Sequence, residues 1–168
     1  MDWRSAHIVV THHGYLREEL PRLECLLDRV SSSCEDWHPV PGELRQAFRS
    51  MRAALEGLML HEESHLFPFC RALEQARERP EALRETLDDA IRIDLCEHED
   101  ARRCLLRILE LNQEFTPPAE CCNSYRALVD GLASLEAELS LYLDEENCLL
   151  FTRARAAEAQ RASAPVPA

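Results

Sequence analysis

Residues 128–146 read LVDGLASLEAELSLYLDEE, and the spacing of the apolar residues in this stretch decides the fold. These residues follow one another at steps of four and three, at Leu128, Leu132, Leu135 and Leu139. Such steps keep side chains on one face of an α-helix, so the stretch predicts an amphipathic helix packed through a single face. The same face continues into two polar residues, Tyr142 and Glu146.

Three further segments repeat this spacing, and turn-forming residues separate all four. The separators are Ser31–Gly42, Arg79–Pro80 and Thr116–Pro118, which leave segments 5–33, 43–78, 82–115 and 120–160. All four are rich in the helix formers Leu, Ala, Glu and Arg, and none alternates as a strand does. Short connections make consecutive helices antiparallel. We therefore predict an all-α, up-down-up-down four-helix bundle over residues 1–160, followed by a flexible tail, 161–168.

Composition and charge exclude several kinds of binding partner and indicate where the protein acts. The 168 residues carry a net charge of −12, which disfavours binding to nucleic acid or to anionic lipid. No apolar run approaches the roughly 20 residues of a membrane-spanning helix. The chain opens without a secretory signal, and its eight cysteines contain no C-x-x-C pair. We expect a cytoplasmic protein whose cysteines are mostly free thiols.

Seven polar residues interrupt the apolar faces, at positions predicted to point inward: His13, Glu62, His65, Asp94, His98, Tyr142 and Glu146. A carboxylate in a dry interior is costly unless it is paired or bound to metal. Counted from the connecting loops, His13, Glu62 and His98 lie at similar depths, and the fit of Glu146 is looser because the connection at Pro117-Pro118 is long. Imidazoles and bridging carboxylates at one level predict a site for two transition metals.

Plainer interpretations of the same residues stay open. The pairs Glu62 with His65 and Asp94 with His98 could be structural ion pairs, and Tyr142 an ordinary core tyrosine. The remaining histidines fall off the inward faces or in a loop and are predicted at the surface: His7, His12, His38 and His61.

Six stretches carry a family resemblance in order along the chain. They are Asp2–Ala6, His13 with Leu16–Pro21, Glu62–Glu63 with Leu66–Pro68, Glu97–Glu99, Thr116–Pro118 with Cys122, and Glu146–Asn147 with Leu150–Phe151. In these the sequence resembles the hemerythrin-like proteins, and among them the di-iron RIC (repair of iron centres) group. The N-terminal cysteine-bearing domain that many of these proteins carry is not part of this sequence.

The resemblance implies a ligand set. It makes His13 and His98 terminal iron ligands and makes Glu62 and Glu146 bridging carboxylates. It also implies a histidine four residues before each bridging glutamate, and here those positions hold Leu58 and Tyr142. Leucine cannot bind a metal, and tyrosine could do so only as a phenolate.

A shifted site is one hypothesis that repairs this loss. His65 and Asp94 both lie one helical turn from the implied ligands, toward the loop at Pro80. The shifted ligand set is His13, Glu62, His65, Asp94, His98 and Glu146. The alternative is that His65 and Asp94 pair with each other and that metal is lost or reduced to one ion.

Three functional hypotheses follow. The first is a non-haem di-metal protein, with iron as the metal and manganese or zinc left open, acting in nitrosative or oxidative stress. The resemblance implies iron donation, repair of damaged iron-sulfur proteins, or binding of NO or O₂. The second is a mono-metal or metal-free module that senses or binds a protein partner. The third is a ferroxidase-like activity, suggested by Glu62-x-x-His65 and Asp94. The sequence contains neither a recognisable nucleophile pair nor a phosphate-binding loop, so it gives no argument for enzymatic turnover.

Overall fold

The computed structural model describes residues 3–33, 42–75, 87–113, 123–146 and 152, and every element among them is a helix. The elements are α1 (Trp3–Ile8), η1 (Val9–His13), α2 (Gly14–Ser33), α3 (Gly42–His61), η2 (Glu62–Leu66), α4 (Phe67–Gln75), α5 (Leu87–Gln113) and α6 (Asn123–Glu145). The symbol η marks a π-helical turn. The prediction of an all-α protein is confirmed.

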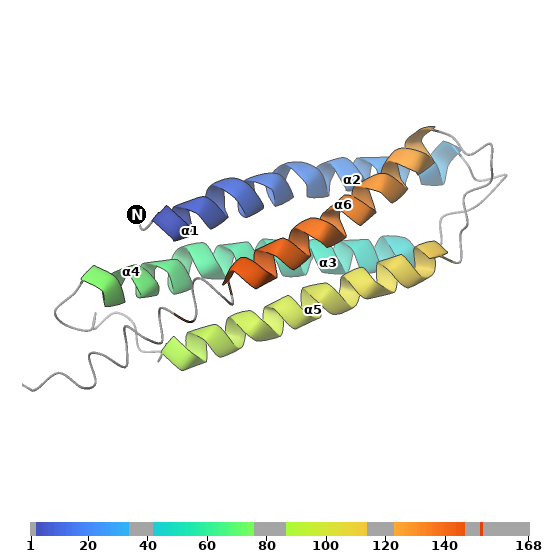
Figure 1. The fold of residues 1–168 in the computed structure, drawn as a ribbon. Coiled ribbons are helices and arrows are strands. Elements are labelled where there is room, and N and C mark those ends of the chain that lie inside the picture. Colours follow the sequence, from blue (N-terminus) through green and yellow to red (C-terminus); the bar gives the residue numbers. More distant parts are fainter. Residues whose placement is uncertain (1–2, 34–41, 76–86, 114–122, 147–151, 153–168) are drawn as a thin grey trace, which may run out of the picture.

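These elements form four helical rods that alternate in direction (Figure 1). The first rod joins α1, η1 and α2 without interruption, and the second joins α3, η2 and α4. Helices α5 and α6 form the third and fourth rods. The principal contacts join α2 to α6 and α3 to α5. The predicted tail, 161–168, lies outside the described residues.

The apolar faces predicted from the sequence form the core. In α6, Leu128, Leu132, Leu135 and Leu139 are all buried, and the equivalent stripe of α2 is buried from Leu16 to Val30. Burying each such side chain contributes about 1.5–3 kcal/mol to folding. A core of this kind runs the length of the rods and holds the polar residues of the bundle at fixed depths.

Two π-helical turns change which residues face that core. A π-turn closes its hydrogen bonds over five residues instead of four, so it holds one extra residue and rotates the inward face. In η1 the rotation brings the adjacent residues His12 and His13 both into the interior. In η2 it buries Glu62 and Leu66 and leaves His65 exposed. The predictions that His65 faces inward and that His12 lies at the surface are therefore wrong.

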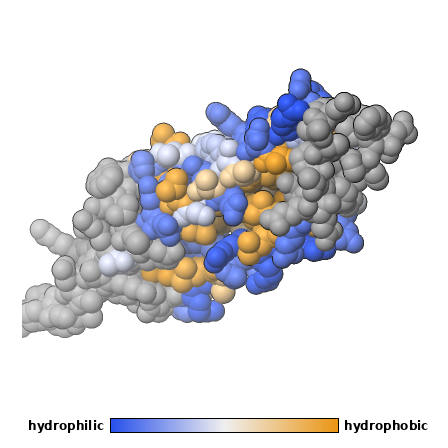
Figure 2. Space-filling model, turned by 45° about the vertical axis from the view of Figure 1, so that its right-hand side comes forward, coloured by the Kyte–Doolittle hydropathy of each residue, from blue (hydrophilic) through white to orange (hydrophobic). Residues whose placement is uncertain are grey.

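The outer surface mixes hydrophobic and hydrophilic side chains, as the face in Figure 2 shows. Among the residues that the structure describes, large apolar side chains are exposed at Val10, Leu60, Leu95, Leu106 and Leu141. In the part of the chain that the structure describes, no helix combines the length and the apolar composition needed to cross a membrane.

Gly131 marks a close approach between α6 and α2. A Cβ atom built there would lie 2.5 Å from Cδ2 of Leu23, a fully buried side chain. Gly57 of α3 offers a matched control, because a Cβ atom there meets nothing within 4 Å.

We predict opposite effects of Gly131→Ala and Gly57→Ala on stability. Alanine raises helix propensity by about 0.8–1 kcal/mol at either position. At Gly131 the methyl group also overpacks Leu23, which costs about 1–3 kcal/mol. Urea denaturation should find Gly57→Ala more stable than the wild type and Gly131→Ala about 1–3 kcal/mol less stable than Gly57→Ala. Equal stabilities would contradict the observed packing of α2 on α6.

Candidate metal centre

Six of the seven predicted polar residues meet at one level of the bundle, and every rod contributes. His13 comes from η1, Glu62 from η2, Asp94 and His98 from α5, Tyr142 from α6, and Glu146 directly follows α6. Five of these side chains are fully buried, and His98 is 5% exposed. We call this group the buried cluster. It places charged residues where an uncompensated charge is most costly.

Glu62 lies at the middle of the buried cluster, and its two carboxylate oxygens face different partners. Oε2 lies 2.9 Å from Nε2 of His13. Oε1 accepts a hydrogen bond from the Tyr142 hydroxyl and lies 3.6 Å from Nε2 of His98. One carboxylate therefore connects the imidazoles of the first and third rods, an arrangement that would let it bridge two metal ions.

On the His98 side, acidic oxygens from three residues converge on one imidazole. Nε2 of His98 lies 2.9 Å from Oε2 of Glu146 and 3.3 Å from Oδ2 of Asp94. One ligand atom from each of these residues and one from Glu62 lie within 4.8 Å of one another. Within the described residues, neither oxygen of Asp94 or Glu146 has a hydrogen-bond partner. Buried oxygens of this kind are costly unless a cation satisfies them, so these residues fit a metal ion.

The charge states of the buried cluster follow from the same crowding. Burial, together with the charges of Glu146 and Glu62, raises the pKa of Asp94 to about 9. Burial and the charge of Glu62 raise the pKa of Glu146 well above its usual value. Burial also acts to raise the pKa of Glu62, but the His13 and His98 imidazoles outweigh it and hold that pKa below its usual range. Without metal, Asp94 therefore keeps its proton at neutral pH.

An outer carboxylate orients His13. Oε1 of Glu63 lies 2.6 Å from Nδ1 of His13 and also accepts a hydrogen bond from Arg17 at 2.7 Å. With Nδ1–H donated to Glu63, Nε2 is the nitrogen that faces Glu62. A histidine whose second nitrogen is held by a carboxylate is the usual arrangement for a metal ligand. Sequence reasoning noted Glu63 as a family match and assigned it no role.

His65 lies outside the buried cluster. Its exposed ring stacks on His61 with centroids 5.3 Å apart, and its Nδ1 lies 3.0 Å from the Ser64 hydroxyl. The partner of Asp94 is His98, so the alternative pairing of His65 with Asp94 is wrong as well. Both errors have one physical cause, because the π-turn η2 turns residue 65 away from the core.

A second group of potential ligands was missed. His7, His12 and Glu145 bring three ligand atoms within 4.8 Å of one another on the flank of the bundle. The adjacent pairs His12-His13 and Glu145-Glu146 were a visible signal in the sequence. The apolar periodicity of each helix selects His13 and Glu146 as the inward members, and it does not reveal that their neighbours meet across the bundle.

The fold and the buried cluster define a class, the helical bundles that bind cations through inward-facing carboxylates and histidines. Residues 4–154 match the family described as the hemerythrin HHE cation binding domain, and the chain belongs to this family. Similar curated proteins include the iron-sulfur cluster repair protein YtfE of Escherichia coli O81 (strain ED1a) and of Escherichia fergusonii. Each is 30% identical over 164 residues, covering 94% of this chain and 70% of the relative. The resemblance noted from the sequence is confirmed.

We predict that the metal-free protein loses stability as the pH rises. The folded protein keeps the Asp94 proton up to about pH 9, while the unfolded chain releases it near its usual pKa of 3.8. Between these values Asp94 lowers the free energy of unfolding by up to about 1.4 kcal/mol per pH unit. Glu146 acts in the same direction. The lowered pKa of Glu62 contributes stability that is fully present above its usual value of 4.5 and is lost as the pH falls below that value. Glu62 therefore does not change the slope above about pH 5.

Denaturant unfolding with a chelator present, at about pH 5.5 and pH 8, measures this slope. Asp94→Asn should flatten it, because the variant has no proton to retain at this position. A wild-type free energy that is constant or rises over this range would contradict the burial of ionisable Asp94.

Proposed function

We propose that the buried cluster holds two iron ions bridged by Glu62. The observation that carries this proposal is the division of the Glu62 carboxylate, whose oxygens face His13 on one side and His98 on the other. The His98 side offers one ion Glu62, Asp94, His98 and Glu146. The His13 side offers the other ion fewer groups, namely His13 and the second oxygen of Glu62. The Tyr142 hydroxyl lies 3.3 Å from Nε2 of His13 and would join them only as a phenolate. Mixed oxygen and imidazole ligands suit iron, and also manganese or zinc.

The carboxylate of Asp94 supports metal binding although Leu58 and Tyr142 stand where the family resemblance implies histidines. Leu58 is buried but offers no ligand atom. Asp94 lies one helical turn before His98 and adds a carboxylate. The His98 side therefore has four protein ligands. The His13 side gains no such group and would hold its ion more weakly.

We propose that this unequal pair acts in nitrosative or oxidative stress by supplying iron to damaged iron-sulfur proteins. Relatives 30% identical to this chain are named iron-sulfur cluster repair proteins. A weakly held ion supports the same role, because donation requires release. We further propose that the protein acts in the cytoplasm, where thiols such as those of Cys25 and Cys96 stay reduced.

Binding of NO or O₂ is a second candidate that one observation favours. A cavity of about 110 Å³ between α3, α5 and α6 is lined by Leu58, His98, Leu139 and Tyr142, among others. It gives a small apolar molecule an approach to the edge of the buried cluster. The ferroxidase-like alternative loses one of its two supports, because His65 is exposed.

Iron content tests the metal assignment. After anaerobic loading with Fe²⁺ and passage over a desalting column that removes free iron, we expect about two iron ions retained per wild-type chain. Glu146→Gln should lose at least one of them, because it removes a buried charged ligand. Glu99→Gln removes an exposed carboxylate from α5 and should keep both.

The outcomes are distinct. Retention of a single ion by the wild type selects a mono-metal module in place of the di-iron centre. No retained iron, or equal iron in Glu146→Gln and the wild type, contradicts metal binding at the buried cluster.

Reactivation of a damaged target tests the role. We expect the iron-loaded chain to restore the activity of an enzyme whose [4Fe–4S] cluster has been damaged by NO. Restoration should exceed that given by the same amount of free Fe²⁺ and should fail with Glu146→Gln. Equal restoration by free Fe²⁺ would contradict donation by the chain.

A further inference from the structure

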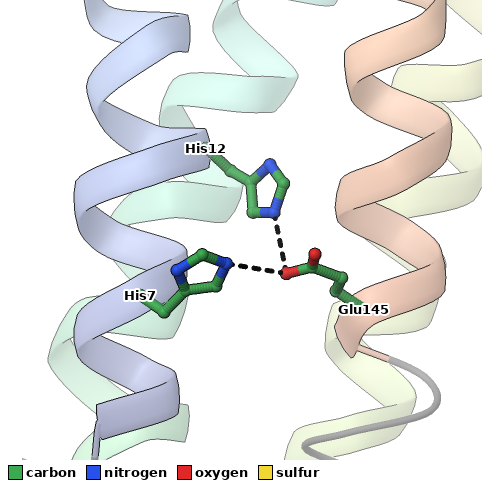
Figure 3. A group of neighbouring side chains, drawn as sticks. All are labelled: His7, His12 and Glu145. Atoms are coloured by element: carbon green, nitrogen blue, oxygen red, sulfur yellow. Dashed lines mark hydrogen bonds and ion pairs between the residues drawn. The ribbon is translucent and has the colours of Figure 1, made fainter.

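A second cluster of ligand atoms lies on the flank of the bundle, between the first and fourth rods (Figure 3). His7 belongs to α1, His12 to η1 and Glu145 to the last turn of α6. Nε2 of His7 lies 3.3 Å from Oε2 of Glu145, and Nε2 of His12 lies 3.1 Å from the same oxygen. We call these three residues the flank cluster.

The flank cluster is built separately from the buried cluster. The ring of His12 stacks on the ring of Tyr142, with centroids 5.3 Å apart and planes 24° apart. Tyr142 in turn donates to Glu62, so its ring lies between the two groups. None of the ligands that the family resemblance implies belongs to the flank cluster. The two groups instead take neighbouring residues, His12 beside His13 and Glu145 beside Glu146.

His12 is held in one orientation by a second carboxylate. Its side chain is 4% exposed, and its Nδ1 lies 2.7 Å from Oε1 of Glu138, which lies two turns before Glu145 on α6. Because a carboxylate accepts this bond, Nδ1 carries a proton, and Nε2 is the nitrogen that faces Glu145. When the ring is neutral, Nε2 offers a lone pair to a metal ion. A carboxylate behind the ring is how proteins orient a metal-binding histidine.

His7 presents the same nitrogen. Its Nδ1 lies 3.3 Å from the Thr11 hydroxyl, which leaves Nε2 directed at Glu145. Two imidazole nitrogens thus face one carboxylate oxygen. With both rings neutral and protonated at Nδ1, three lone pairs would face one another, which is unfavourable unless a cation lies between them.

The distances suit a metal ion. With metal–ligand bonds of about 2.1 Å, neighbouring ligands of a tetrahedral or octahedral ion lie about 3.0–3.4 Å apart. The two separations at Glu145, 3.1 and 3.3 Å, fall in this range. His7 is 46% exposed and Glu145 is 33% exposed, so the remaining coordination positions face solvent.

We propose that His7, His12 and Glu145 bind one divalent transition metal ion on the flank of the bundle, and that Glu138 positions His12. Two histidines and one carboxylate, with open positions, form a ligand set used for Zn²⁺ and Fe²⁺. This site is independent of the proposed iron centre. Its partial exposure leaves it open to solvent, whereas the buried cluster is enclosed.

Titration with Co²⁺ alone tests the proposal, because the visible spectrum of Co²⁺ reports coordination by protein ligands. The parent for this experiment is Asp94→Asn/Glu146→Gln, in which the buried cluster is disabled. We expect this parent to bind about one Co²⁺ ion. His7→Ala and Glu145→Gln should each weaken the affinity at least about tenfold, and Glu138→Gln about 10–100-fold through the orientation of His12. His65→Ala, which removes an exposed histidine outside both clusters, should leave the affinity unchanged.

Three outcomes would overturn the proposal. They are a parent that binds no Co²⁺, equal binding by His7→Ala and the parent, and weakening by His65→Ala as large as that by His7→Ala. The first would leave the flank cluster as an imidazolium–carboxylate ion pair. If the double variant does not fold, the same titration is made on the otherwise wild-type chain after iron has filled the buried cluster. Failure of the iron centre would not affect the Co²⁺ result, so the two proposals fail separately.

Discussion

The central constraint on this bundle is the burial of the Glu62 carboxylate at the middle of an apolar core. A buried carboxylate is tolerated only where its oxygens are satisfied, and here each oxygen faces a different imidazole. The two imidazoles come from separate rods, so the helices can meet only at the depth that brings them together. The apolar stripes supply the free energy of folding, and Glu62 fixes the register of the rods.

The π-helical turns allow two clusters to share one end of the bundle. A regular helix turns neighbouring residues about 100° apart, so His12 and His13 would point in clearly different directions in one. In η1 both are buried, and each serves a different group. Glu145 and Glu146 divide in the same way at the end of α6, where residue 146 is itself in a π-turn. Such turns occur often at functional sites because they direct a ligand that regular spacing would turn away.

The sequence predicts the site well wherever the helix is regular. Asp94 and His98 in α5, and Tyr142 in α6, continue the three-and-four spacing of the apolar residues, and all three are buried as expected. The errors fall at the π-turns, where His65 and His12 exchange surface and interior. A π-turn depends on side chains meeting across the bundle, and periodicity within one helix carries no information about that meeting. The flank cluster could not be predicted from the sequence, because its residues also meet across the bundle.

The replaced ligands give the buried cluster its asymmetry. With Leu58 and Tyr142 at two positions where the family resemblance implies histidine, the cluster keeps two imidazoles and gains the carboxylate of Asp94. Three carboxylates so close repel one another, and the raised pKa values of Asp94 and Glu146 show that the empty site is most stable with protons retained. A metal ion must displace those protons, so ions of higher charge gain most. Replacement of imidazole by carboxylate would therefore favour hard cations that bind oxygen over softer ions.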